Sequence, residues 1–221
     1  MDYNEAILYD KRSYCDYYMD LIKRKQLILF TFLSNKDYNI FHIKFSLFLF
    51  SFSLYFAVSG FFFEDKTMHK IYQNKGKLKL IYKIPPIIYS ILICSLINII
   101  IKYFALSNKD MLGIKKIKEK ENAFKESVYL LKRLKIKFVI FFFISFAFIL
   151  FFWYFISAFC AAYKNTQVIL IENTIVSFGI SLLYPFGLNL FPGFIRMASL
   201  KAPNKDLECL YKFSQIVAYL I

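Results

Sequence analysis

The stretch FVIFFFISFAFILFFWYFISAFCAAY, Phe138–Tyr163, decides the fold class because its 26 consecutive residues carry no charge. A membrane hydrocarbon core of roughly 30 Å is crossed by about 20 helical residues. A helix buried in a soluble protein usually keeps a polar face, and this stretch has none. It therefore predicts a helix that spans a membrane.

Three further windows are free of charge: Phe45–Phe63, Ile84–Ile101 and Asn173–Ile195, of 19, 18 and 23 residues. The 221-residue chain is 58% hydrophobic, where soluble domains average about 45–50%, and its mean hydropathy is +0.47. The predicted fold class is all-α. We expect an integral membrane helical bundle with flanking amphipathic helices and a transmembrane domain over 45–200, whose four spans lie at about 45–63, 84–106, 138–163 and 173–195.

The flanking segments carry weaker helical patterns. Within residues 1–44, an amphipathic membrane-surface helix is predicted by helical spacing of Tyr14, Tyr17, Tyr18, Leu21 and Ile22. A basic cytoplasmic helix is expected at about 114–137, running directly into the third span. Residues 201–221 are expected to form a C-terminal cytoplasmic helix from about Lys205, and residues 64–83 a loop with a turn at 74–76.

The distribution of basic residues predicts orientation and partners. Short loops of alternate sides hold 21 and seven Lys and Arg residues, and the richer side usually faces the cytoplasm. Both termini are therefore predicted to be cytoplasmic. The net charge of +14 could suit nucleic acid. Because the lysines border apolar spans, the expected partner is instead a lipid bilayer with anionic headgroups, and no nucleic acid.

The second span carries a polar stripe with a spacing of four residues: Ser90, Cys94, Asn98 and Lys102. Such a stripe occupies one side of a helix. It could line an aqueous path or pack against another helix, with Lys102 reaching the interface. The packing interpretation is favoured because Lys102 lies near the end of the span.

The fourth span contains four residues that disrupt helices: Pro185, Gly187, Pro192 and Gly193. Each proline lacks the N–H that would bond the carbonyl four residues back, here that of Ser181 or Leu188. We expect a kinked or broken helix whose freed groups find partners within the protein. Broken helices form binding sites in transporters, but a packing kink is the favoured interpretation.

The end of the third span is rich in small residues. Ser157 with Ala161, and Ala158 with Ala162, are small-xxx-small pairs, which let helices approach closely in lipid. These four residues are predicted to pack helices, within the chain, in a homo-oligomer or against partner membrane helices. Cys160 is interpreted as a packing residue beside them.

Catalytic, cofactor and metal sites are not indicated. The four cysteines form no C-x-x-C motif, and His42 and His69 are distant in the chain. A pairing of Cys160 with His69 and Asp65 is conceivable but matches no motif. The sequence favours a non-enzymatic membrane anchor or assembly module. A channel or transporter subunit, using the polar stripe and the broken fourth span, is the alternative, and a membrane enzyme ranks third.

Several phrases occur together along the chain, among them FFFEDKTMHKIY, SAFCAAYKNTQ, SLLYPFGLNLFPGFIRM and ECLYKFSQI. Together they resemble the C-terminal membrane module of large uncharacterised transmembrane proteins of AT-rich protists, ciliates among them. The resemblance covers nearly the whole chain. It implies a membrane protein and no particular reaction.

Overall fold

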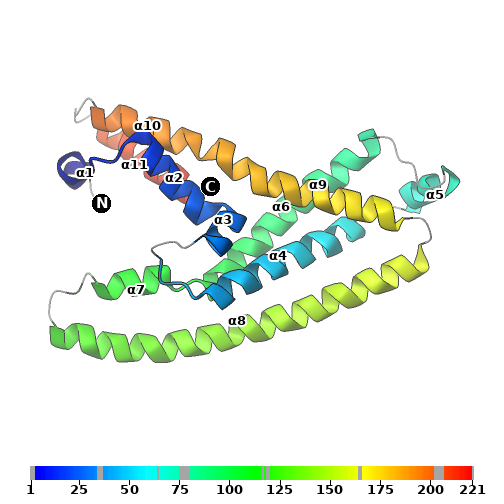
Figure 1. Ribbon diagram of the computed structural model, residues 1–221, viewed down its shortest axis with the longest axis horizontal. Coiled ribbons are helices and arrows are strands. Elements are labelled where there is room, and N and C mark those ends of the chain that lie inside the picture. Colours follow the sequence, from blue (N-terminus) through cyan, green and yellow to red (C-terminus); the bar gives the residue numbers. More distant parts are fainter. Residues whose placement is uncertain are drawn as a thin grey trace. The chain divides into compact units, whose positions relative to one another are not determined.

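The computed structural model describes residues 3–33, 37–63, 65–74, 80–115, 117, 120–163, 166–201 and 207–220 (Figure 1). Every regular element in these ranges is a helix, so the all-α prediction is confirmed. Four helical segments are long and apolar enough to cross a membrane: Phe41–Phe61, Ile84–Ala105, Glu121–Ala162 and Gln167–Lys201. The expected turn at 74–76 lies mostly outside the described residues.

The chain divides into two compact units. Unit 1 combines the two ends of the sequence, Met1–Asn35 and Ser181–Ile221, and unit 2 is the continuous stretch Lys36–Ile180. Each unit has its own packing and is described by itself. The predicted division at 44/45 and 200/201 differs from this one, because unit 1 takes the end of the fourth span together with the N-terminal helices.

Unit 2 is built around helix α4 (Phe41–Phe61), which packs against both α6 (Leu80–Ala105) and α8 (Lys120–Ala162) (Figure 1). Helix α8 has 43 residues and is therefore about 65 Å long at 1.5 Å per residue. That length exceeds a hydrocarbon core of roughly 30 Å. A hydrocarbon core of this thickness could therefore hold only the apolar second part of α8, and the basic first part would extend beyond it.

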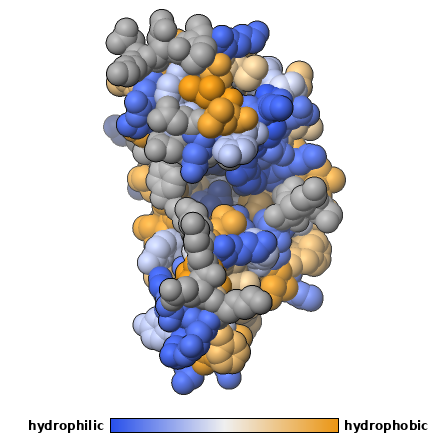
Figure 2. Space-filling model, turned by 90° about the vertical axis from the view of Figure 1, so that its left-hand side faces the viewer, coloured by the Kyte–Doolittle hydropathy of each residue, from blue (hydrophilic) through white to orange (hydrophobic). Residues whose placement is uncertain are grey.

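The predicted basic helix at about 114–137 is correct in its second part and wrong at its start. Residues Ile114 and Lys115 end a separate helix, α7 (Asn108–Lys115), and α8 begins at Lys120. Asp110 of α7 fastens this helix to α8 through Lys137 at 3.1 Å and Arg133 at 3.8 Å. In Figure 2, hydrophilic residues cover much of the visible surface where α7 and the start of α8 face the viewer.

Two spans begin earlier than their charge-free windows. Helix α4 starts at Phe41 and includes Lys44, whose side chain is buried against Asp37 with Nζ 2.8 Å from Oδ1. Helix α9 (Gln167–Leu188) starts six residues before Asn173 and includes Glu172 on an exposed face. A charge that is paired or faces outward does not end a helix, so windows without charge underestimate these two spans.

The segment between the first two spans contains a helix that the sequence interpretation missed. Helix α5 (Asp65–Gln73) places Met68 and Ile71 on one side, three residues apart. Both side chains join a buried cluster of unit 2: Phe63, Met68, Ile71, Phe159, Ile169 and Leu170. Burial of two apolar side chains, each contributing about 1.5–3 kcal/mol, explains why residues expected to form a loop are helical.

Unit 1 contains α1 (Tyr3–Tyr9), α2 (Tyr14–Lys25), α3 (Leu27–Phe32), the end of α9, α10 (Leu190–Lys201) and α11 (Leu207–Leu220). Helix α2 starts where expected because Ser13 and Asp16 form a capping box. Its last turn carries Lys23, Arg24 and Lys25, which suit the negative end of the helix dipole. Gln26 ends α2 and caps α3, accepting from the Leu29 N–H at 2.5 Å.

The fourth span is interrupted at Asn189, between α9 and α10. Pro192 is the third residue of α10, where a missing N–H costs no helical bond. The carbonyl of Pro185 accepts from the Asn189 backbone N–H at 3.1 Å and from Asn189 Nδ2 at 2.7 Å. The Phe186 carbonyl accepts from the Tyr18 hydroxyl at 2.9 Å. The Pro185 carbonyl thus keeps its helical N–H partner and gains a side-chain donor, and the Phe186 carbonyl receives a side-chain donor from α2.

Gly193 lies in the contact between α2 and α10. A Cβ atom at Gly193 would stand 2.8 Å from Cε2 of Tyr14. The Tyr14 ring is also stacked on Phe194, with ring centroids 4.7 Å apart. The sequence interpretation treated Gly193 as a helix breaker. In the structure it is a helical residue whose missing side chain leaves room for an aromatic ring.

Candidate functional site

The polar stripe of α6 faces α4 within unit 2. Ser51 Oγ of α4 donates to Asn98 Oδ1 at 2.8 Å, and the Ser59 and Ser90 hydroxyl oxygens lie 3.5 Å apart. The two pairs are eight residues apart on both helices and run in opposite order, as antiparallel helices require. Ser90 and Cys94 are fully buried. Three stripe residues therefore belong to a helix–helix contact.

A third helix adds to this contact. The Ser177 hydroxyl of α9 lies 3.5 Å from that of Ser59 and donates to the Asn173 carbonyl at 2.6 Å. The residues Ser51, Ser59, Ser90, Asn98, Asn173 and Ser177 form what we call the polar seam. The seam residues of α4 and α9 were not identified from the sequence. Ser51 and Ser59 are separated by eight residues, as are Ser90 and Asn98, and this equal spacing could have predicted their pairing.

The fourth stripe residue, Lys102, lies three residues before the end of α6 and is half-buried. The next residue, Tyr103, has the Lys137 amine 5.5 Å from its ring centroid. Lys137 also donates to the Leu106 carbonyl at 2.6 Å, just beyond the end of α6. The end of α6 is thus a basic region where the second span meets α8.

Asn98→Leu is expected to weaken the packing of α4 on α6 by about 0.5–1.5 kcal/mol, the net contribution of a typical intramolecular hydrogen bond. The cause is loss of the acceptor for Ser51. The measurement is the free energy of unfolding in detergent, with Ser95→Ala as control. Ser95 also lies on α6, but its hydroxyl bonds the Leu92 carbonyl of its own helix. An Asn98→Leu protein no less stable than Ser95→Ala would contradict this role.

The four small residues near the end of α8 are all exposed: Ser157, Ala158, Ala161 and Ala162. The Ser157 hydroxyl donates to the Trp153 carbonyl of its own helix at 2.8 Å, so it needs no partner elsewhere. The neighbouring Cys160 is half-buried and packs against the cluster that contains Phe159. The small residues thus form an outward face of α8, and we call these four the small-residue patch.

Cys160, His69 and Asp65 are not joined by hydrogen bonds in the described part of the chain. His69 Nε2 instead lies 2.9 Å from Gln73 Nε2, one turn along α5. No group of three His, Cys, Asp or Glu side chains within the described ranges could hold a metal ion. The cysteines of these ranges are free thiols, exposed at Cys15 and Cys209.

Unit 1 contains a buried ion cluster that the sequence interpretation missed. Arg196 of α10 is 2% exposed and its Nη2 donates to Asp10 Oδ2. Arg12 donates to the same carboxylate from Nε at 2.8 Å and from Nη2 at 2.7 Å, and its Nη1 donates to Asp20 Oδ2 at 3.1 Å. The Arg196 guanidinium also lies over the Tyr17 ring, 4.3 Å from its centroid. No local pattern could reveal a pair 186 positions apart.

The charges of this cluster support one another. Hydrogen bonds from Arg12 hold the pKa of the Asp10 carboxyl far below its usual range, against the opposing effect of burial, and the charge of Arg196 lowers it further. The same hydrogen bonds raise the pKa of the Arg12 guanidinium. Asp10 is therefore a permanent anion under physiological conditions, as a buried arginine requires.

The chain matches no protein-family model, no curated protein and no solved structure.

Proposed function

We propose that this chain is an integral membrane protein with four spans that acts as a non-enzymatic anchor or assembly module, associating with a second copy of itself through the small-residue patch. The observation that carries the proposal is a contrast between two surfaces. The residues of the polar seam contact other helices of the same chain, whereas the small-residue patch is exposed.

The membrane part of the proposal is supported by what the long helices expose. The window of α8 that fits a membrane is only 17% buried, and that of α6 only 22%. Their outward side chains are large and apolar, including Phe143, Leu150 and Trp153 at 54–74% exposure. Apolar faces of this extent are stable against lipid and unfavourable in water.

The proposed topology places both chain ends on one side of the membrane. The N-terminal helices and the two C-terminal helices pack within unit 1, as shown by α10 against α2 and α1 against α11. Four spans return the chain to its starting side, which agrees with this packing. The excess of Lys and Arg in the corresponding loops assigns that side to the cytoplasm.

The assembly part rests on backbone access at the small-residue patch. In lipid, the hydrophobic effect does not drive helices together. Association therefore depends on the van der Waals contacts that form when two helices approach closely. Ser157 and Ala161 lie on one side of α8 and Ala158 and Ala162 beside them, which together leave a flat surface two residues wide. A matching helix from a second copy can lie against such a surface with close backbone contact.

Ser157→Leu combined with Ala161→Leu is expected to abolish dimer crosslinking of the full chain in liposomes. The bulky side chains would hold the two α8 backbones apart. The measurement is the fraction of crosslinked dimer on denaturing gels, at protein-to-lipid ratios at which the wild type crosslinks.

The matched control is Ala158→Ser combined with Ala161→Ser, which changes chemistry but keeps size, and it should crosslink like the wild type. Unchanged crosslinking of the leucine variant would overturn the assembly role. Equal loss in both variants would show that crosslinking fails without any added side-chain bulk, and would contradict close packing as its cause.

A channel subunit is the second candidate, favoured by Asn173. Both polar atoms of its side-chain amide are buried and lack hydrogen-bond partners among the described residues. A conducted ion or water would supply such partners. Ion flux into liposomes containing the purified chain, altered by Asn98→Leu, would support this candidate over the assembly role.

A further inference from the structure

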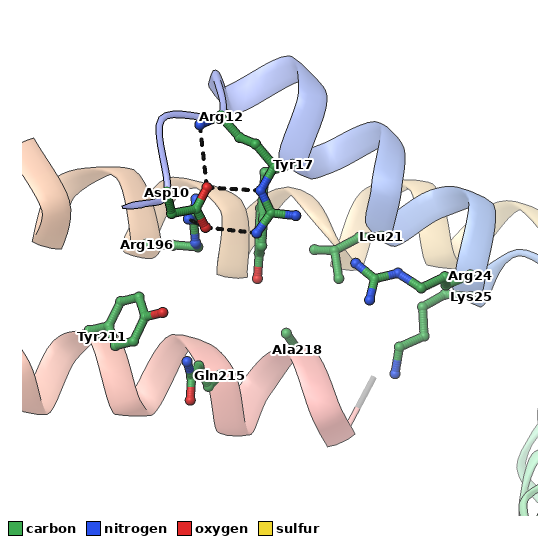
Figure 3. A pocket seen from close by; sticks show the side chains of 10 residues that line it. All are labelled: Asp10, Arg12, Tyr17, Leu21, Arg24, Lys25, Arg196, Tyr211, Gln215 and Ala218. Carbon is green, nitrogen blue, oxygen red and sulfur yellow. Dashed lines mark hydrogen bonds and ion pairs between the residues drawn. The ribbon is translucent and has the colours of Figure 1, made fainter. Parts of the chain in front are cut away.

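Unit 1 contains a pocket of about 400 Å³ between α2, α10 and α11 (Figure 3). Four cationic side chains line it, from Arg12, Arg24, Lys25 and Arg196, and one carboxylate, Asp10. The excess of positive charge is unusual for a packing defect, because like charges around one space repel one another. A pocket of this size suits a small ligand.

The deepest cation of the pocket has a donor without an acceptor. Arg196 is 2% exposed, and its Nη2 bonds Asp10. Its Nη1 is buried and has no hydrogen-bond partner among the described residues. Buried polar atoms are nearly always bonded. Arg196 thus combines a place in the lining of a basic pocket with a buried donor that has no acceptor among the described residues.

The outer cations come from the last turn of α2. Arg24 donates from Nε to the Asp20 carbonyl at 3.0 Å, which fixes the guanidinium near the helix. In Figure 3, the side chains of Arg24 and Lys25 leave α2 on the side that faces α11. The pocket thus has a buried arginine at its floor and two basic side chains at its edge.

We propose that this pocket binds a phosphate monoester, carried by a lipid headgroup or by a soluble phosphate compound. A phosphate monoester offers three oxygen atoms and nearly two negative charges. An arginine guanidinium can donate two parallel N–H bonds to two oxygens of such a group, and a lysine adds a positive charge. This inference goes beyond the assembly role, involves none of the residues of the small-residue patch, and stands or falls separately.

A lipid source is chemically reasonable because Arg196 lies within the segment Gln167–Lys201, one of the four that could cross a membrane. Basic pockets at the ends of membrane helices are positions where phosphate headgroups bind. A soluble source uses the same donors and is separated from the lipid source by experiment.

The experiment measures the thermal unfolding temperature of the full chain in neutral detergent. The probes are dispersed phosphatidic acid, phosphatidylserine at equal charge, soluble glycerol phosphate and inorganic phosphate. A ligand that binds only the folded state raises this temperature in a saturable manner. We expect phosphatidic acid to do so at lower concentration than phosphatidylserine, which carries a phosphodiester and no monoester.

Arg24→Gln and Lys25→Gln test the edge of the pocket without disturbing the buried cluster. Each is expected to weaken the apparent affinity for phosphatidic acid roughly tenfold, as loss of one charge-assisted contact predicts. The matched control is Lys132→Gln, which removes the same charge from an exposed position of α8. That variant should bind like the wild type.

The results separate the sources and can overturn the proposal. Saturable stabilisation by glycerol phosphate as well as phosphatidic acid supports a phosphate site that accepts soluble compounds. Stabilisation by phosphatidic acid alone supports a headgroup site. An equal response to phosphatidylserine, no response to any probe, or equal weakening by Lys132→Gln overturns the proposal. None of these outcomes depends on crosslinking through α8.

Discussion

Replacing Asp10 by asparagine is expected to destabilise unit 1 by about 3–5 kcal/mol, the cost of removing one partner from a buried ion pair. Arg196 would remain buried at 2% exposure without its counter-ion. The measurement is hydrogen exchange of the α2 and α10 amides, with the amides of α4 and α8 in unit 2 as the internal reference. Only the amides of unit 1 should lose protection.

Asp20→Asn is the matched control, because Asp20 is also an aspartate bound to Arg12, but its side chain is 49% exposed. An exposed ion pair contributes about 0–1 kcal/mol, so this variant should exchange almost like the wild type. Equal effects of the two substitutions would contradict the importance of burial. The double variant Asp10→Asn with Arg196→Met should be less destabilised than the two single effects combined, because no charge stays buried.

The same carboxylate makes the stability of unit 1 depend on pH. The folded state lowers the pKa of Asp10, chiefly through hydrogen bonds from Arg12. Stabilisation is then fully present above the pKa of an unfolded aspartate, about 3.9, and is lost as the pH falls below it. In the wild type, protection of α2 and α10 should decline below pH 4. In Asp10→Asn this part of the acid dependence should be absent.

Gly193→Ala is expected to destabilise the packing of α2 on α10 by about 1–3 kcal/mol, the typical cost of overpacking. The new Cβ would lie 2.8 Å from Cε2 of the Tyr14 ring, so α2 or the ring must move. Elsewhere in a helix, alanine is more stable than glycine by about 0.5–1 kcal/mol. Hydrogen exchange of α2 measures the effect.

Gly187→Ala is the matched control on α9, because no heavy atom lies within 4 Å of a Cβ there. This variant should be neutral or more stable than the wild type. Adding Tyr14→Leu to Gly193→Ala should restore part of the lost protection, since a smaller side chain leaves room for the Cβ. A Gly193→Ala protein as protected as Gly187→Ala would show that α2 does not pack closely on α10.

The spans and α2 were predictable because their signals are local. Apolar runs of 18 to 26 residues determine a helix that can cross a membrane without reference to the rest of the chain. In α2 the aromatic and apolar spacing, together with the basic last turn, predicts a helix whose N-terminus Ser13 and Asp16 then set. The shift of α4 to Phe41 escaped prediction because the charge of Lys44 is neutralised by Asp37, which is visible only in three dimensions.

The sites were less predictable because they depend on distant partners. The polar stripe was visible at Ser90, Cys94 and Asn98, but its role depends on which helix it meets. The position of the break in the fourth span was also not evident. Two prolines and two glycines flank Asn189, where the interruption lies, and its side-chain amide donates to the Pro185 carbonyl. The pairing of Asp10 with Arg196 left no local pattern at all.

The division of unit 1 between the two ends of the chain has a consequence for synthesis. A ribosome adds about 5–20 residues per second, and 186 positions separate Asp10 from Arg196. Arg196 is therefore synthesised roughly 10–40 s after Asp10. During that time α1 and α2 have nothing of α10 or α11 to pack on. A premature stop codon before the codon for Arg196 would thus release a protein whose beginning, and not only its end, stays unpacked and open to proteases.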